Sequence, residues 1–413
     1  MQRVAMIVWN DFRNDARVLK EAQTLQAHGY QVRVHALHTP GSTTHFETLK
    51  EGIEVHRIAR SPLWKWRTSG PSRSTQPIAT VATGTLHKLS AGRQILRLCA
   101  RAWTHSVLLI KMIQYRADVI HAHDVNTLPT AWLAARLSGA RLIYDAHEIS
   151  TSREGYASFR SVVHAVEKRL MPVADGVITT TDARAKYFAR TYGVPRPLVL
   201  QNRPRFIEST RTNRIRHELS LTEEWPIILY QGGLQQGRGL EKLIRTAVKV
   251  PNAYLLLIGG GRLTPELNQL THSLGLEDRV YFIPTVPLAE LPSYTASAEI
   301  GVQPIENTCL NHYTTDSNKL FEYLIAGLPV VATDFPEIRR IVRPNEVGLL
   351  VPGNDQAALA EALNKLVVDA PLRARYAENA RTTAATLNWE EQESRLVDLY
   401  SRVLTPAPDK TLK

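Results

Sequence analysis

The order of hydrophobic and polar positions along the chain predicts two series of alternating strands and helices. In the first half, short apolar runs that predict strands occur at Val4–Val8, Val32–Ala36, Val119–His121, Leu142–Tyr144, Val177–Thr180 and Leu198–Leu200. In the second half they occur at Ile227–Tyr230, Tyr254–Ile258, Val280–Ile283, Ile300–Gln303, Val330–Ala332 and Leu349–Val351. Helical patterns lie between these runs. The alternation predicts an α/β protein with two doubly wound, Rossmann-like sheets of parallel strands.

A polar stretch from Asn202 to Trp225 separates the two series. It contains Pro204 and five arginines, which is typical of a linker rather than of a core element. We therefore expect a first domain over residues 1–201, a linker over 202–225, a second domain over 226–386, and a C-terminal helix and tail over 387–413. The last helix, predicted at Trp389 to Val403, can pack across either domain.

The composition agrees with two globular domains. The chain has 413 residues, of which 44% are hydrophobic and 22% charged, and a chain of this length can bury two cores of about 200 residues each. The cysteines, Cys99 and Cys309, make no disulfide framework, which favours a reducing compartment. No apolar run reaches the length of a membrane-spanning helix, and the first one is too short for a signal peptide. We therefore expect a cytoplasmic location.

The formal net charge of +11 arises in one segment. Between Val55 and Ala117 there are eleven Lys and Arg residues and no Asp or Glu, and Arg93, Arg97 and Arg101 repeat at helical spacing. Two interpretations stay open: residues 57–116 lie on an anionic membrane surface, so that the protein is peripheral to the cytoplasmic membrane face, or they form a solvated helix face beside a loop. No nucleic-acid-binding motif accompanies the charge, so no nucleic-acid partner is expected.

In the second half, two segments suggest a phosphate site. The stretch from Ser317 to Thr333 combines Lys319, a helix start and Glu322, and free backbone N–H groups at a helix start can hold a phosphate. The glycine-rich turn after the strand Ile227–Tyr230 contains Gly232, Gly233 and Arg238, and glycines let a backbone approach a ligand closely. Glu322 alone would be no more than a solvated helix residue, but together these groups suggest a nucleoside diphosphate site.

In the first half, three polar clusters follow predicted strands, and ligands of open α/β sheets bind at the carboxyl ends of strands. The candidate cleft residues of these clusters are Asn10, Asp15, His121, His123, Asp124, His147 and Glu148. The sequence His121-Ala122-His123-Asp124 also suggests metal ligands. Because residues two apart at the end of a strand need not converge on one point, we favour polar residues that face the cleft over a metal site.

The pattern Asn318-Lys319-Leu320-Phe321-Glu322-Tyr323, with Ala326-Gly327-Leu328-Pro329 after it, resembles the donor-site signature of family-4-type retaining glycosyltransferases with the GT-B fold (glycosyl transferases group 1). The resemblance extends over nearly the whole chain. The segments Asn14–Val18, His121–Asp124 and Asp145–Glu148 and the glycine-rich turn all stand where this family has theirs.

The resemblance implies a role for individual residues. His123, Arg238 and Lys319 would be catalytic: His123 would reach toward the transferred sugar, and the two cations would neutralise the leaving diphosphate. The remaining donor-binding residues would include Glu322, on the ribose, and Thr285, in the loop that contacts the base. The other residues of the implied donor site are Gly232, Gly233, Asn318 and Leu320.

This chain departs from the family pattern at Thr314, where the first Glu of the Glu-x7-Glu motif would stand. Asp316 and the backbone of Ser317 and Asn318 are candidates to hold the sugar hydroxyls in its place. No Asp-x-Asp sequence occurs, so we expect no metal and no cofactor beyond the co-substrate, with cationic side chains in the role of the metal.

The resemblance implies a retaining glycosyltransferase that moves a sugar from a nucleoside-diphosphate sugar to an acceptor of a cell-surface glycan, a glycolipid or a small glycoside. No protein nucleophile for retention can be named. Two alternatives remain: a GT-B-fold sugar-nucleotide epimerase, which would need acidic and basic side chains beside the sugar, and a non-catalytic GT-B subunit that binds a nucleotide.

Overall fold

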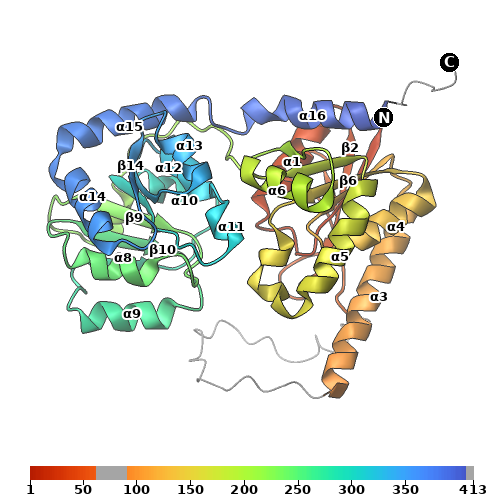
Figure 1. The fold of residues 1–413 in the computed structure, drawn as a ribbon, viewed down its shortest axis with the longest axis horizontal. Coiled ribbons are helices and arrows are strands. Elements are labelled where there is room, and N and C mark those ends of the chain that lie inside the picture. Colours follow the sequence, from red (N-terminus) through yellow and green to blue (C-terminus); the bar gives the residue numbers. More distant parts are fainter. Residues whose placement is uncertain (62–90, 406–413) are drawn as a thin grey trace.

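The computed structural model describes residues 1–61 and 91–405 and shows two α/β domains joined by a linker and by a long C-terminal segment (Figure 1). The aromatic and basic stretch Leu63–Arg67 lies outside the described residues. In the part of the chain that the structure describes, no helix has the length and apolar composition that crossing a bilayer requires.

The first domain contains an eight-stranded sheet with the order β3-β4-β2-β1-β5-β6-β7-β8. Its strands are β1 (Arg3–Ile7), β2 (Gln31–Leu37), β3 (Phe46–Thr48), β4 (Glu54–Ile58), β5 (Val119–His123), β6 (Arg141–Ala146), β7 (Gly176–Thr179) and β8 (Leu198–Val199). The helices that connect them are α1 (Ala16–Ala27), α3 (Ala91–Tyr115), α4 (Leu128–Ser138), α5 (Arg160–Leu170) and α6 (Asp182–Tyr192), with short 3-10 turns at Ser150–Ser152, Glu154–Phe159 and Met171–Val173. One apolar core packs α1 against this sheet, and a second packs α3, α4 and α6.

The second domain contains a six-stranded sheet with the order β11-β10-β9-β12-β13-β14. Its strands are β9 (Ile227–Gln231), β10 (Tyr254–Ile258), β11 (Val280–Ile283), β12 (Ile300–Gln303), β13 (Val330–Thr333) and β14 (Gly348–Val351). Its helices are α8 (Leu240–Ala247), α9 (Thr264–Ser273), α10 (Leu291–Thr295), α11 (Leu310–Tyr313), α12 (Asn318–Ile325), α13 (Pro336–Val342), α14 (Gln356–Val368) and α15 (Ala370–Ala384). All of the sheet's pairings are parallel.

The prediction of two Rossmann-like sheets is confirmed, and each apolar run predicted as a strand overlaps an observed strand. Two strands, β3 and β4, were not predicted. The strand β3 pairs antiparallel with β4 at the edge of the first sheet, so this sheet is not entirely parallel. The residues of β3, Phe46-Glu47-Thr48, are exposed or half-buried, and a short polar edge strand carries no continuous apolar run.

The linker region divides between the two domains. The short helix α7 (Arg214–Glu218) lies inside the expected linker, and its Ile215 is fully buried in the apolar core of the second domain. The second domain therefore begins before the expected residue 226, and the connecting segment is shorter than its polar composition indicated.

The last helix, α16 (Glu390–Leu404), crosses back to the first domain and packs beside α1 (Figure 1). Trp389 at its start is fully buried, and the indole Nε1 donates a hydrogen bond of 2.9 Å to Thr24 Oγ1 of α1. Further along, Leu399 and Val403 pack against the backbone of Gly176 in β7. The first domain is therefore completed by residues from the far end of the chain.

Replacement of Trp389 by Ala leaves a large cavity under α16. Such substitutions cost about 3–5 kcal/mol, so we expect the W389A variant to unfold at a clearly lower urea concentration, as followed by far-UV circular dichroism. The control is Val368→Ala, because Val368 is 80% exposed in α14. Equal unfolding midpoints for the two variants would show that α16 does not stabilise the first domain.

Candidate active site

A cleft of about 660 Å³ lies between the two domains. Both sheets direct the carboxyl ends of their strands toward it, which is where open α/β sheets bind ligands. Of the candidate residues predicted from sequence, those that line it are Asn10, Asp15, His147, Glu148, Gly232, Gly233, Arg238, Asn318, Lys319 and Glu322. The structure therefore brings most of the two predicted groups together across one opening.

Lys319 lies in the first turn of α12, with its side chain only 7% exposed. Its Nζ lies 4.6 Å from the centroid of the Tyr230 ring, and a Cβ atom at Gly232 would stand 3.2 Å from the same nitrogen. Glycine at position 232, with a φ of 127°, therefore makes room for the ammonium group. Burial and the charge of Arg238, opposed by Glu322, lower the pKa of Lys319 to about 7.

Neither Lys319 nor Arg238 forms an ion pair with a carboxylate among the described residues. Arg238 lies in the turn between β9 and α8 and lines the same cleft. The start of α12 adds backbone N–H groups beside them, after Ser317, which adopts an uncommon φ of 59°. Two cations and a helix start on one wall of a cleft can bind a diphosphate.

Glu322 stands one turn further along α12, and a neighbouring amide orients it. Gln231, the last residue of β9, donates a hydrogen bond of 2.5 Å from Nε2 to Glu322 Oε2, and its Oε1 accepts one of 2.8 Å from Thr295. Burial raises the pKa of Glu322, while the bond from Gln231 and the charge of Lys319 act in the opposite direction. The carboxylate is therefore fixed in place at the edge of the cleft, where it can accept hydrogen bonds from two hydroxyls.

On the facing wall, a buried ion pair supports the cleft residues of the first domain. Arg17 of α1 binds Asp145 at the end of β6 with two hydrogen bonds, of 2.7 and 3.0 Å, and donates a third, of 2.7 Å, to the carbonyl oxygen of Leu200 after β8. Burial disfavours the charge of Asp145, but Arg17 and His147 outweigh it and hold the pKa of this carboxyl well below its usual range. Three separate segments are thereby tied together beneath the cleft.

The histidine that faces the cleft from this wall is His147. Its Nε2 lies 3.0 Å from Asp145 Oδ2, and its side chain is 19% exposed. Burial alone would lower the pKa of His147, but Asp145 and Asp124 raise it to about 10. His147 is therefore an imidazolium at neutral pH, paired with the Asp145 carboxylate, and it adds positive charge to this wall of the cleft.

The placement of His121 in the cleft was wrong. His121 is fully buried on β5, and its Nδ1 lies 2.8 Å from the hydroxyl oxygen of Tyr400 in α16. His123 is 2% exposed and lies behind His147, with 3.3 Å between His123 Nδ1 and His147 Nε2. The cause is the same for both: the segment after β6 and helix α16 cover the end of β5.

Three further candidates lie away from the lining of the cleft. Asp124 is half-buried beside Arg153, at 3.9 Å, and adopts a φ of 64°. The side chain of Leu320 is fully buried in the core of the second domain, so only its backbone can take part in binding. Thr285 is exposed in the loop after β11. Its predicted contact with a base therefore stays a prediction.

Thr314, which stands where the family motif has its first Glu, faces the first domain instead of the cleft. It is 4% exposed, its Oγ1 accepts a hydrogen bond of 3.3 Å from Arg184 Nε, and its carbonyl oxygen accepts one of 3.0 Å from Thr181. Arg184 also donates to the carbonyl oxygen of Asn311, at 3.1 Å. Position 314 therefore holds the two domains together.

Asp316, two residues later, lines the cleft. It is 5% exposed, and Oδ2 accepts a hydrogen bond of 2.7 Å from Gln201 Nε2 of the first domain. Burial raises the pKa of Asp316, against the bond from Gln201 and the charge of Arg184. Asp316 thus places a buried carboxyl group, bound by the first domain, at the lining of the cleft.

Gln231 and Arg184 belong to the site although neither was a candidate from sequence. For Gln231 there was a signal, since it is a polar residue at the carboxyl end of an apolar strand. For Arg184 there was none, because its partners Asn311 and Thr314 lie on the other domain, more than 120 residues away.

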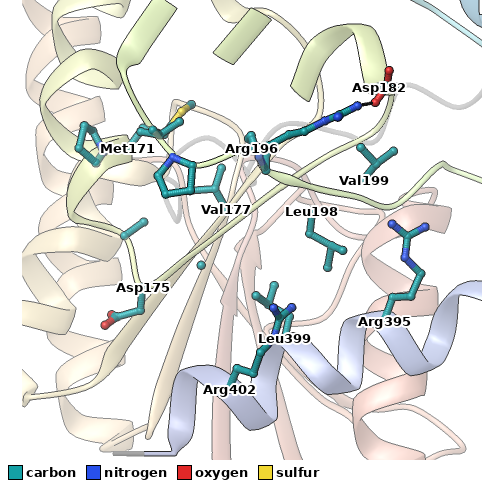
Figure 2. A pocket seen from close by; sticks show the side chains of 16 residues that line it. Met171, Asp175, Val177, Asp182, Arg196, Leu198, Val199, Arg395, Leu399 and Arg402 are labelled. Atoms are coloured by element: carbon teal, nitrogen blue, oxygen red, sulfur yellow. Dashed lines mark ion pairs between the residues drawn. The ribbon is translucent and has the colours of Figure 1, made fainter. Parts of the chain in front are cut away.

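A second hollow, of about 590 Å³, lies beside β7 and β8 of the first sheet (Figure 2). Asp175 and Arg196 stand there just before β7 and β8, at the amino ends of these strands, and α16 contributes Arg395, Leu399 and Arg402. In this hollow Arg196 is already paired with Asp182. The polar groups described above converge on the cleft between the domains and not here.

The buried groups of the first domain include one set that could be considered for a metal. Ligand atoms of Glu21, His121, His123 and Asp145 lie within 4.8 Å of one another. The Arg17 Nε, however, lies 2.7 Å from Asp145 and 3.2 Å from Glu21. Because a guanidinium already occupies the position between the carboxylates, this donor set fits a buried ion network better than a metal centre.

Comparison with known proteins agrees with this arrangement. Residues 211–383 match the family model described as glycosyl transferases group 1, and residues 15–203 match the one described as a glycosyl transferase 4-like domain. The chain belongs to the group 1 glycosyltransferases. This glycosyltransferase is 27% identical to a D-inositol 3-phosphate glycosyltransferase of Xylanimonas cellulosilytica over 311 residues, which are 70% of this chain and 73% of the relative.

Solved structures show that its fold is GT-B. The sucrose-phosphate synthase of Thermosynechococcus elongatus matches with a TM-score of 0.77 and 21% identity, over 98% of this chain and 99% of that one. HepE of Anabaena, solved in complex with UDP-glucose, matches with a TM-score of 0.73 and 18% identity, over 97% of this chain and 100% of that one.

The lowered pKa of Lys319 predicts that binding of a nucleoside-diphosphate sugar takes up a proton. In the free protein the pKa of this lysine is about 7, and a bound diphosphate, which has no ionisation of its own near neutrality in such a sugar ester, raises it. The affinity for the nucleoside-diphosphate sugar should therefore be highest below pH 7 and fall as the pH rises above 7, by up to about tenfold per pH unit.

Titration calorimetry at pH 8 in buffers of different ionisation enthalpy measures the proton directly. We expect uptake of about one proton by the native protein and almost none by Lys319→Arg, because arginine stays charged at this pH. Equal proton uptake by the two proteins would show that another group titrates.

Proposed function

We propose that the protein is a retaining, metal-independent glycosyltransferase that uses a nucleoside-diphosphate sugar as donor. Its acceptor belongs to a cell-surface glycan, a glycolipid or a small glycoside. The observation that carries the proposal is the wall of the cleft formed by Lys319, Arg238 and the start of α12, with Glu322 beside them. It presents positive charge that no carboxylate of the described residues neutralises by an ion pair.

The chemistry follows from the charge that develops on the leaving group. When the bond from the anomeric carbon to the phosphate oxygen breaks, its electron pair stays on the diphosphate. Lys319, Arg238 and the backbone N–H groups at the start of α12 would stabilise this charge from one wall of the cleft. These cations supply the charge that a metal supplies in other transferases, and transfer should proceed in the presence of EDTA.

The nucleoside has a site next to the phosphate wall. Glu322, held by Gln231, is placed to accept hydrogen bonds from the two ribose hydroxyls. Beside Glu322 lies a mainly apolar hollow of about 360 Å³, whose lining includes Leu288, Leu291 and Ile325. A flat base fits such a surface. HepE, which shares the fold, binds UDP-glucose, and this supports a nucleoside-diphosphate sugar as the donor class.

The sugar and the acceptor would lie toward the first domain. Asp316, which lines the cleft, would accept hydrogen bonds from sugar hydroxyls in place of the Glu that the family motif has at position 314. On the facing wall His147, Asn10 and Asp15 line the cleft. Their polar side chains suit a hydroxylated acceptor. The relative of Xylanimonas cellulosilytica is named D-inositol 3-phosphate glycosyltransferase, and this name supports a small hydroxylated acceptor.

The test is a sugar-transfer assay with variants of the cleft wall that contains Lys319, Arg238 and Glu322. Donors are first chosen by thermal shift among nucleoside-diphosphate sugars, since a ligand of the native state raises the melting temperature. We expect Arg238→Ala to lower kcat/KM about 100- to 1000-fold, the usual cost of losing a group that stabilises transition-state charge. Glu322→Ala should act mainly by raising the donor KM.

The matched control is Arg262→Ala, because Arg262 is an exposed arginine in the glycine-rich turn after β10 and does not line the cleft. Proton NMR of the product should show the anomeric configuration of the donor. Inverted product would contradict the retaining course. Conversion of the donor sugar into its epimer without an acceptor would show that the protein is an epimerase. Binding of the nucleotide without any turnover would show that it is a non-catalytic subunit. Either result would contradict the proposal.

A further inference from the structure

The helix α3 (Ala91–Tyr115) is packed along only part of its length. From Thr104 onward it buries one stripe of side chains, Thr104, Leu108, Met112 and Tyr115, against the first domain. Before Thr104 this burial of apolar side chains stops, and Ile95, Leu96 and Leu98 are 61%, 62% and 65% exposed. Figure 1 shows this part of α3 projecting beyond the sheet and the other helices.

The exposed part extends past the carboxyl edge of the first sheet. Arg101 lies 5.9 Å from the ring centroid of Trp9, which follows β1, and Thr104 Oγ1 donates a hydrogen bond of 3.2 Å to the carbonyl oxygen of Arg60, which follows β4. Residues before Arg101 therefore lie beyond the ends of the strands. This is the edge at which the cleft opens.

This projecting part is amphipathic. At helical spacing, Arg97 and Arg101 continue the stripe that Thr104 and Leu108 bury further along. On the opposite side lie Ile95 and Ala102, with Leu98 flanking them, so the apolar side faces away from the domain. A helix that exposes large apolar residues on one side and arginines on the other is typical of helices that lie in a membrane interface.

The charge around this helix indicates whether its exposed apolar side contacts a second copy of the chain or a lipid bilayer. From residue 91 to residue 117 the chain contains no Asp or Glu, and Arg97, Arg101, Lys111 and Arg116 are all exposed. Two copies of α3 packed side by side would bring these cations together without acidic partners on the helix, which is unfavourable. An anionic bilayer both neutralises the arginines and takes up the apolar side chains.

We propose that the first turns of α3 bind an anionic lipid bilayer, with Ile95, Leu96 and Leu98 entering the interface and Arg97 and Arg101 contacting the headgroups. The helix lies on the membrane and does not span it. Because these turns project from the carboxyl edge of the sheet, binding holds the acceptor half of the cleft close to the membrane. This role concerns attachment and is separate from the transfer chemistry of the cleft.

The experiment is co-sedimentation of the full-length protein with phosphatidylcholine vesicles that contain or lack phosphatidylglycerol. We expect binding to the anionic vesicles only, weaker at high salt. The double variant Ile95→Ser/Leu98→Ser should lose at least tenfold in partition coefficient. Arg97→Gln/Arg101→Gln should lose about fivefold per arginine, which is the effect of one basic residue near an anionic surface.

The matched controls are Val368→Ser and Arg262→Gln, which change exposed residues of the second domain and should bind like the native protein. Circular dichroism of each variant checks that it is folded. Equal binding by the α3 variants and the controls, or no binding by the native protein, would overturn the proposal. So would a native dimer in light scattering that the Ile95→Ser/Leu98→Ser variant loses, because the apolar side would then contact a second copy.

Discussion

The ammonium group of Lys319 is held where burial disfavours its charge, and the donor half of the site is arranged around it. Gly232 gives it room, Tyr230 supports it with the face of its ring, and Arg238 adds a second cation beside it. Glu322 lies nearby, but its carboxylate is bound by Gln231. A wall with two cations that form no ion pair with a carboxylate of the described residues gains most when a dianion approaches, which favours the diphosphate donor that we propose.

This wall of the second domain can act on a sugar donor only if the first domain faces it, and two sets of contacts hold the domains in this arrangement. Arg184 reaches from the first domain to Thr314 and Asn311 of the second, while α16 carries the end of the chain back onto α1. The first contact uses position 314, where the chain departs from the family motif. Thr314 faces Arg184 and Thr181, whereas Asp316, two residues later, lines the cleft, and we propose it for the contact with the sugar.

The parts that depended on local sequence could be predicted. Strands buried on both faces are continuous apolar runs, and Lys319, Glu322 and Arg238 follow strands or open a helix. The parts that depended on distant segments could not. The alternation along β5 does not reveal that His147 covers His123, or that Tyr400 closes over His121. Likewise, the contact between Arg184 and Thr314 joins residues of different domains, and β3 is too short and polar to leave a pattern.

A crystal structure of the protein with a bound nucleoside diphosphate would test the central claim most directly. The account predicts that both phosphates lie between Lys319 Nζ, Arg238 and the first turn of α12, and that the ribose hydroxyls contact Glu322. A nucleotide bound elsewhere, or a diphosphate that contacts neither Lys319 nor Arg238, would contradict it.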